Sequence, residues 1–314
     1  MLPNIGTAKP PDPPPHADGL RPDPARDYAE ALGRFAKLSA RDGPVISSPG
    51  RSRFYAHGKR TPLSIVLIHG FTNCPQQWDM FASELQEAGH TIVVPRLPGH
   101  GHYFRGTHAL SRVTAPALLA TVNQAVDIAC GAGERVVLAG LSIGGTFAPR
   151  IALARADIAH TISIVPFFAP AKFSIKGTSR LAAVLEFVPN FFVSWDPGGD
   201  DSLIPSYGYP RFASRMLAES LRIGIAVEAI ARERAPAGHT TFMLNAREPA
   251  CNNAVSEAVR AGFERDRPGS TGLIVLEDLP ANHDIIDPTN AVARVDLVYP
   301  VLRRLIEATA YAPR

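Results

Sequence analysis

Short, largely apolar runs alternate along this chain with segments whose apolar residues recur at helical spacing. The apolar runs cover residues 63–68, 91–94 and 135–139, and helical segments cover residues 76–88 and 113–130. A run without polar alternation is typical of a central parallel strand that is covered on both faces. Because strands and helices alternate, we predict an α/β fold with a mostly parallel sheet and helices on both faces.

The same pattern predicts further elements on either side of this central part. They are a helix at 28–40, edge strands at 45–47 and 53–56, strands at 160–165, 241–244 and 272–276, and a closing helix at 288–308. No internal repeat is visible in the sequence. The chain of 314 residues is therefore long enough for one large α/β domain with an insertion.

Two segments depart from the alternation of strands and helices. Residues 1–25 are polar and rich in proline, so we expect them to be extended or disordered. Residues 170–237 lack strand signals and are rich in Phe, Trp and Tyr. We predict that they form a cap or lid over the carboxyl edge of the sheet, although these aromatic residues also suit the cap's own core. Residues 26–169 and 238–314 would then form the α/β core.

A glycine-rich turn follows the apolar run at 135–139, and its sequence is Gly140-Leu141-Ser142-Ile143-Gly144-Gly145. A serine between glycines, where a strand turns sharply into a helix, presents its hydroxyl at the top of a sheet. The glycines are needed because a Cβ would clash where strand and helix approach each other. Ser142 is therefore the candidate nucleophile, and the alternative is an ordinary glycine-rich turn.

A serine hydroxyl becomes a good nucleophile only when a base takes its proton. His283 is the one histidine beyond the final predicted strand, so it is the candidate base. An acid must orient the imidazole, and Glu248 is the only acid on the loop after the strand at 241–244. Asp278 and Asp284 are the competitors, but an acid this close in sequence to the base rarely turns back to the correct ring nitrogen.

Two backbone amides would meet the negative charge that develops on the attacked carbonyl oxygen. We expect them to belong to Ile143, which follows the nucleophile, and to Phe71, in the loop after the strand at 63–68.

His100, His102 and His108 form a local cluster on a glycine-rich loop. No acid or cysteine lies at the usual ligand spacing, so we expect these histidines to shape the site and predict no metal there.

Composition and charge narrow the classes of partner. The net charge is +3, which indicates neither a nucleic-acid surface nor a polybasic membrane surface, and no apolar run is long enough to span a membrane. The three cysteines lie far apart and fit free thiols. The amino terminus lacks the features of a signal peptide, so we expect a cytoplasmic protein; a missing native leader would instead fit a secreted or periplasmic one.

The combination of these motifs resembles the α/β-hydrolase superfamily, in particular bacterial carboxylesterases and monoacylglycerol-lipase-like esterases. The resemblance covers about residues 45–308 and is carried by His69-Gly70-Phe71-Thr72, Pro98-Gly99-His100-Gly101, the Ser142 turn, residues 245–248 and His283. It implies an eight-stranded, mostly parallel sheet, a cap between strands six and seven, and no cofactor.

The chain departs from the family pattern in its acid. Esterases of this type usually carry aspartate at the position of Glu248, although glutamate is chemically competent. The loop at residues 95–98 also lacks an acidic residue that is often present there. A serine at position 142 argues against dehalogenases and epoxide hydrolases, which attack through a carboxylate.

The expected function is a serine carboxylic ester hydrolase that acts through an acyl-enzyme, with a small-molecule ester as its partner. Short-to-medium-chain esters or monoacylglycerols are the expected substrates, because the aromatic residues of the cap suggest an apolar acyl pocket. Two alternatives are another acyl hydrolase on the same residues, such as a thioesterase, amidase or peptidase, and a non-catalytic binding protein. The sequence leaves the acyl length and the oligomeric state open.

Overall fold

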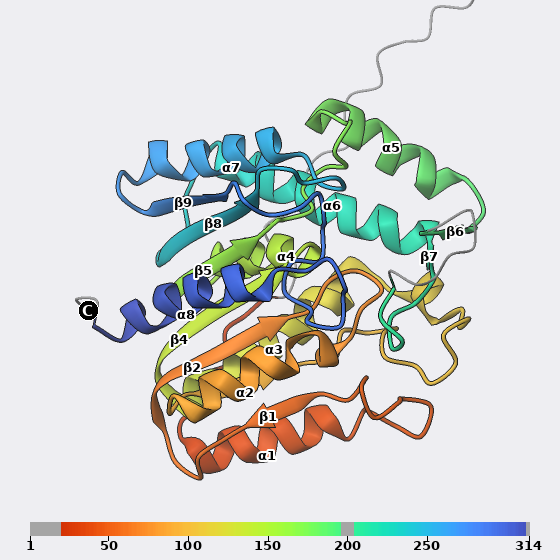
Figure 1. Ribbon diagram of the computed structural model, residues 1–314. Helices are drawn as coiled ribbons and strands as arrows, with labels where there is room; N and C mark the ends of the chain where they lie inside the picture. Colours follow the sequence, from red (N-terminus) through yellow and green to blue (C-terminus); the bar gives the residue numbers. More distant parts are fainter. Residues whose placement is uncertain (1–19, 196–203, 312–314) are drawn as a thin grey trace, which may run out of the picture.

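The computed structural model describes residues 20–195 and 204–311, and Figure 1 shows their arrangement. One sheet contains seven strands in the order β1-β3-β2-β4-β5-β8-β9. Their bounds are Arg53–Tyr55 (β1), Thr61–Ile68 (β2), Thr91–Val94 (β3), Gly133–Leu141 (β4), Ile158–Ile164 (β5), His239–Asn245 (β8) and Thr271–Leu276 (β9). Strand β1 runs antiparallel to β3, and every other neighbouring pair in this sheet is parallel. The predicted mostly parallel α/β sheet is confirmed.

Helices cover both faces of this sheet (Figure 1). Their bounds are Tyr28–Ser39 (α1), Asp79–Glu87 (α2), Ala115–Ala132 (α3), Ile143–Ala152 (α4), Ile175–Phe187 (α5), Ser214–Ala231 (α6), Asn253–Asp266 (α7) and Val295–Tyr311 (α8). Short 3-10 helices lie at Pro75–Trp78 (η1) and Ala109–Arg112 (η2). Within the described ranges, no helix is both long and apolar enough to cross a bilayer.

Strand β2 shows why its apolar run has no polar alternation. Leu63, Ile65 and Leu67 belong to a buried cluster with side chains of α2 and α8. Val66 and Ile68 belong to a second cluster with side chains of α1, α3 and α4. Because successive strand residues point to opposite faces, helices on both faces bury every position from 63 to 68. Ser64, the polar residue of this run, donates its hydroxyl proton to the carbonyl oxygen of Ala129.

The sheet has one strand fewer than the eight that the family resemblance implies, counted over the described residues. The segment at 45–47, predicted as an edge strand, makes only an isolated bridge between Ile46 and His102. Its backbone hydrogen bonds instead join it to the loop after β3. The amide of Ser47 donates to the carbonyl oxygen of Gly101, and the amide of Tyr103 donates to the carbonyl oxygen of Val45. Prolines at positions 44 and 49 flank this segment and keep it from extending along β1.

The segment at 170–237 contains two strands that the sequence pattern did not predict. Strands β6 (Phe192–Ser194) and β7 (Arg211–Ala213) form a separate antiparallel pair. In Figure 1 this pair lies to the right of the carboxyl end of β2, and α5 lies above α6. Helix α6, by contrast, packs against the core layer, because its Val227 and Ile230 share a buried cluster with Leu153, the residue after α4, and Phe263 of α7. Residues 196–203 of this segment and residues 1–19 lie outside the described residues.

The closing helix begins at Val295 rather than at residue 288. The carboxylate of Asp287 accepts hydrogen bonds from the amide and the hydroxyl of Thr289, at 2.9 and 2.7 Å. A side chain that bonds the backbone two residues on favours a turn over a helix. The sequence pattern at 288–294 therefore belongs to a loop that precedes α8.

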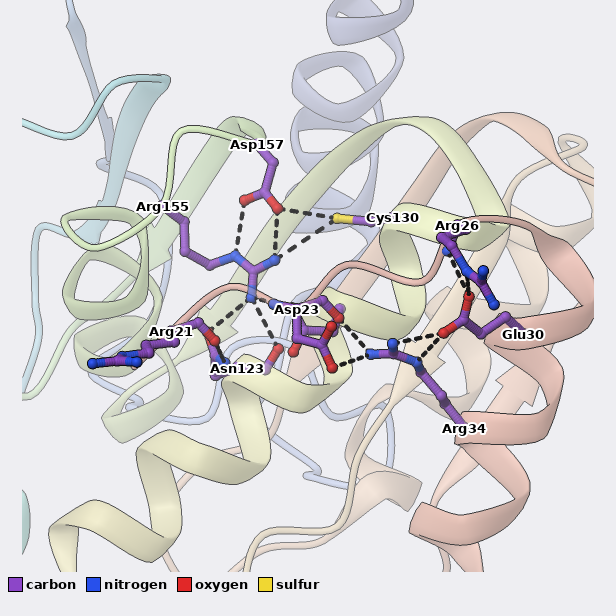
Figure 2. A network of polar contacts seen from close by, with 10 residues as sticks. Arg21, Asp23, Arg26, Glu30, Arg34, Asn123, Cys130, Arg155 and Asp157 are labelled. Carbon is purple, nitrogen blue, oxygen red and sulfur yellow. Dashed lines mark hydrogen bonds and ion pairs between the residues drawn. The ribbon is translucent and has the colours of Figure 1, made fainter. Parts of the chain in front are cut away.

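A buried arginine joins α3 to the connection between α4 and β5. Arg155, whose side chain is 0% exposed, pairs with Asp127 and with Asp157, both at 2.6 Å. It also donates to the side-chain oxygen of Asn123 at 2.8 Å. Cys130 lies at the edge of this network, which Figure 2 shows.

The same network holds the first described residues against α3. Asn123 donates to the carbonyl oxygen of Arg21 at 3.1 Å, and the amide of Asp23 donates to the carboxylate of Asp127 at 3.0 Å. The carboxylate of Asp23 in turn pairs with Arg34 of α1 at 3.0 Å (Figure 2). The part of the proline-rich segment that the structure describes, residues 20–25, is thus docked on the core without regular secondary structure.

We predict that Arg155→Ala lowers the free energy of unfolding by about 3–5 kcal/mol. The substitution removes the cation that pairs with the carboxylates of Asp127 and Asp157. The matched control is Arg294→Ala, which breaks an exposed pair with Asp296 and costs below about 1 kcal/mol. Urea denaturation of both variants measures the difference. Equal losses in the two variants would contradict this role of Arg155.

Candidate active site

Ser142 lies in the sharp turn between β4 and α4, where its backbone adopts φ 59° and ψ −116°. This conformation is costly for a residue with a side chain, so the surroundings must enforce it. The amide of Ser142 donates to the carbonyl oxygen of Ile164, and its own carbonyl accepts from the amide of Phe167. These bonds to β5 and the loop beyond it hold the turn in place.

The glycines of the turn are required by close backbone approach. A Cβ on Gly140 would lie 2.3 Å from the carbonyl carbon of Gly144, and a Cβ on Gly144 would lie 2.4 Å from the carbonyl oxygen of Ile68. Both separations are far shorter than a van der Waals contact. The predicted reason for the glycines around Ser142 is confirmed.

The structure brings the side chains of Ser142, His283 and Glu248 together. His283 Nε2 lies 2.8 Å from Ser142 Oγ, and His283 Nδ1 lies 2.8 Å from Glu248 Oε1. Both are hydrogen-bond distances. The three residues come from the loops after β4, β8 and β9, which all end at the same edge of the parallel sheet. The arrangement places a carboxylate, an imidazole and a hydroxyl in one line.

Glu248 is positioned by its own loop. Its Oε1 atom also accepts hydrogen bonds from the amides of Ala250 and Cys251, at 2.8 and 3.2 Å. The side chain is 1% exposed, so the carboxylate is shielded from solvent beside the imidazole. Asp278, one of the competing acids, is exposed and is not among the partners of His283.

Asp284, the other competing acid, points to a different part of the site. Its Oδ2 atom accepts hydrogen bonds from Asn73 at 3.1 Å and from Gln77 at 2.8 Å. Gln77 in turn accepts from the amide of Gly70 at 2.8 Å. Burial, followed by the nearby charge of Asp287, raises the pKa of Asp284 to about 7. Asp284 therefore links the His283 loop to the loop after β2, a connection that sequence reasoning missed.

A second link that sequence reasoning missed joins the Glu248 and His283 loops. The side-chain nitrogen of Asn245, the last residue of β8, donates to the carbonyl oxygens of Pro280 and Asn282, at 2.9 and 2.8 Å. Asn245 is fully buried. The two carbonyl groups that it holds lie three residues and one residue before His283, so this amide fixes where the imidazole leaves the backbone.

Opposing effects act on the charge of His283. Burial disfavours the imidazolium and on its own lowers the pKa of His283. The neighbouring Cys251 and the carboxylate of Glu248 act in the opposite direction and prevail, so the pKa of His283 lies well above its ordinary value. An imidazole with a raised pKa is a stronger proton acceptor in its neutral form.

The loop after β2 carries Phe71, one of the two predicted amide donors. His69 braces this loop, because its Nε2 accepts from the amide of Leu97 at 3.1 Å. Burial, followed by the charge of His100, lowers the pKa of His69 well below its ordinary value, which suits this acceptor role. Thr72 has a φ of 60° and receives a hydrogen bond from Trp195 Nε1 at 2.8 Å.

Ile143, the other predicted donor, is the first residue of α4. Amides in the first turn of a helix have no acceptor within the helix, and they point outward from its N-terminus. The loop carrying Phe71 and the N-terminus of α4 both follow neighbouring parallel strands, β2 and β4. This placement is compatible with both amides serving one oxygen atom near Ser142.

A cavity of about 520 Å³ opens above Ser142 and His283. One part of its wall is apolar and consists of Phe71, Leu141, Phe167, Pro170, Trp195, Ile204, Pro205, Phe212 and Leu217. Another part is polar and consists of Asn73, Gln77, Asn282, Asp284 and Asn290. The residues from 195 to 217 belong to the segment predicted as a cap, so that segment contributes much of the apolar wall.

The three clustered histidines have separate partners. His100 is buried and shares a hydrogen bond with the carbonyl oxygen of Pro98. The amide of His102 donates to the hydroxyl of Tyr209, and the ring of His108 packs edge-on against Phe192. These contacts join the loop after β3 to the segment at 170–237.

We predict that Glu248→Gln lowers the pKa of His283, because the carboxylate that stabilises the imidazolium is lost while burial remains. Titration of the imidazole resonances by NMR spectroscopy measures this change. Asp278→Asn is the matched control and should leave the pKa of His283 as it is. The assignment of the acid is wrong if the two variants behave the other way round.

Comparison with known proteins places the chain among relatives of the same fold. The thermostable monoacylglycerol lipase of a Bacillus species is 31% identical over 121 residues, which make up 38% of this chain and 46% of that protein. The match thus spans less than half of the relative's length.

Solved structures of low sequence identity share the fold. A soluble variant of monoglyceride lipase from Saccharomyces cerevisiae, in complex with a substrate analog, has a TM-score of 0.67 at 13% identity, over 82% of this chain and 91% of that one. The monoacylglycerol lipase of Paleococcus ferrophilus has a TM-score of 0.61 at 14% identity, over 83% and 98%. The model of the alpha/beta hydrolase family matches residues 65–293, most of the chain. The chain therefore belongs to the alpha/beta hydrolase family.

Proposed function

We propose that this protein is a serine carboxylic ester hydrolase that acts through an acyl-enzyme. The observation that carries the proposal is the line of two 2.8 Å contacts from Glu248 through His283 to Ser142, at the floor of a cavity. A hydroxyl, an imidazole and a buried carboxylate in this order are the elements of nucleophilic acyl transfer. The relationship to a monoacylglycerol lipase supports an ester as the substrate.

In the first half of the reaction, Ser142 Oγ attacks the carbonyl carbon of the ester. His283 Nε2 takes the hydroxyl proton, and Glu248 holds the imidazole with its proton on Nδ1 and stabilises the imidazolium. The amides of Phe71 and Ile143 donate to the oxygen that becomes negative. When the tetrahedral intermediate collapses, His283 returns the proton to the departing alcohol, and Ser142 remains acylated.

In the second half, a water molecule enters from the cavity and His283 takes one of its protons. The resulting hydroxide attacks the acyl carbon through a second tetrahedral intermediate at the same two amides. The carboxylic acid leaves and Ser142 regains its proton. These steps use only side chains and amides of this chain.

The cavity wall has an apolar part and a polar part, and together they suggest which ester binds there. The apolar part, to which Trp195, Phe212 and Leu217 contribute, suits an acyl chain. The polar part, with Asn73 and Asp284, suits an alcohol that carries further hydroxyl groups. A volume of about 520 Å³ is within the usual range for small-molecule sites. We therefore propose short-to-medium-chain esters or monoacylglycerols as substrates, with residues 170–237 as the cap over the acyl chain.

We expect Ser142→Ala to lower kcat for a short-chain nitrophenyl ester by about a millionfold, as for other nucleophiles of this kind. The spectrophotometric release of nitrophenol measures the rate, and thermal unfolding shows that the variant keeps its fold. Ser163→Ala, which removes a buried hydroxyl bonded to Gly145, is the control for loss of a neighbouring serine. Hydrolysis at the wild-type rate by Ser142→Ala would refute the proposed function.

A further inference from the structure

A cysteine shares the buried side of the His283 ring with Glu248. Cys251 Sγ lies 3.8 Å from His283 Nδ1, the same atom that contacts Glu248 at 2.8 Å. One ligand atom from each residue, a sulfur, a nitrogen and an oxygen, lies within 4.8 Å of the other two. The proposed ester hydrolysis uses the carboxylate and the imidazole but has no use for the thiol.

The carboxylate of Glu248 also has an oxygen atom that makes none of these contacts. While Oε1 accepts from the imidazole and from two amides, Oε2 is buried and has no hydrogen-bond partner among the described residues. A buried carboxylate oxygen without a partner costs free energy, and a cation would relieve that cost. The unpartnered oxygen is therefore an observation, separate from the thiol, that points to a cationic ligand.

We propose that Glu248, Cys251 and His283 form a binding site for Zn²⁺ that switches the proposed ester hydrolysis off. Thiolate, imidazole and carboxylate are the ligands that Zn²⁺ prefers, and tetrahedral zinc holds neighbouring ligand atoms roughly 3.3–3.8 Å apart. The separation of 3.8 Å between Cys251 Sγ and His283 Nδ1 already fits this geometry. The contact between Nδ1 and Glu248 must open by only a few tenths of an ångström.

The tautomer of His283 explains why the metal inhibits. A neutral imidazole carries one proton, and in the active form that proton is on Nδ1, leaving Nε2 free to accept the proton of Ser142. When Zn²⁺ binds Nδ1, the ring proton moves to Nε2, which then cannot act as a base. Starting from the neutral imidazole, the ring keeps its one proton and the thiol of Cys251 loses its proton to solvent, so binding releases one proton. The two anionic ligands balance the charge of the ion.

The surface near this site provides a route for the ion. Cys251 and the side chain of Glu248 are buried, but Arg247 and Pro249 in the same loop are exposed. This loop connects β8 to α7. Its opening breaks the hydrogen bond from the amide of Ala246 to the carbonyl oxygen of Leu276 in β9, and that from the amide of Ala171 to the carbonyl oxygen of Ala250. Metal entry therefore requires a local movement that opens these two contacts.

The first test is inhibition by Zn²⁺ of nitrophenyl ester hydrolysis in a buffer that does not bind metal. We expect reversible inhibition that a chelator abolishes, with a zinc inhibition constant at least about tenfold weaker in Cys251→Ala than in the wild type. Cys130→Ala, which removes a thiol far from the triad in the Arg155 network, is the matched control and should keep the wild-type zinc sensitivity. Equal inhibition of all three proteins, or none of the wild type, overturns the proposal.

The second test does not depend on activity, so it separates this proposal from the proposed function on which it rests. Co²⁺ added to Ser142→Ala should produce the thiolate-to-cobalt charge-transfer band and the visible bands of tetrahedral coordination, and Cys251→Ala on that background should lack the charge-transfer band. If the wild type hydrolyses no ester, the proposed function fails, but the cobalt spectrum still decides the metal site. A spectrum without a thiolate band, or one unchanged by Cys251→Ala, contradicts the site.

Discussion

The hydrogen bonds that tie the loops after β2, β8 and β9 to one another are the constraint on which the site depends. Ser142 and His283 are 141 residues apart in the chain, and a histidine on a free loop would lose much conformational entropy when it docked on the serine. Asn245 and Asp284 remove that freedom in advance: one holds the carbonyls before the imidazole, and the other anchors the residue after it. The parallel sheet supplies the common edge where these loops meet.

The buried carboxylate of Glu248 holds the imidazole of His283 in place and also makes it more basic. Two loop amides stabilise one of its oxygens, and the same oxygen raises the pKa of the imidazole. Low local polarity strengthens this interaction. The second oxygen is buried and has no partner among residues 20–195 and 204–311. A single arrangement therefore accounts for the basic imidazole that ester hydrolysis needs and for the proposed response to Zn²⁺.

Features that depend on local sequence could be predicted, whereas most features that depend on distant contacts could not. The apolar run of β2 and the glycines beside Ser142 are local, because burial on both faces and a close backbone approach restrict the residue types at those positions. The chain order of serine, acid and histidine selected Ser142, Glu248 and His283, and the structure places the imidazole of His283 2.8 Å from each of the other two side chains. The link from Gln77 to Asp284 spans 207 residues and has no pattern in the sequence. Likewise, Asp287 shortens the closing helix through a side-chain turn that helical spacing does not reveal.

The proposed ester hydrolysis requires that the fold makes the hydroxyl of Ser142 a nucleophile. A fluorophosphonate reacts covalently with a serine only where a base activates the hydroxyl and amides stabilise the oxygen, so it measures this property without any assumption about the ester. Mass spectrometry of the treated full-length protein should find one phosphonate group per chain, on the peptide that contains Ser142. An unmodified protein, or a group attached to a different residue, would contradict the account.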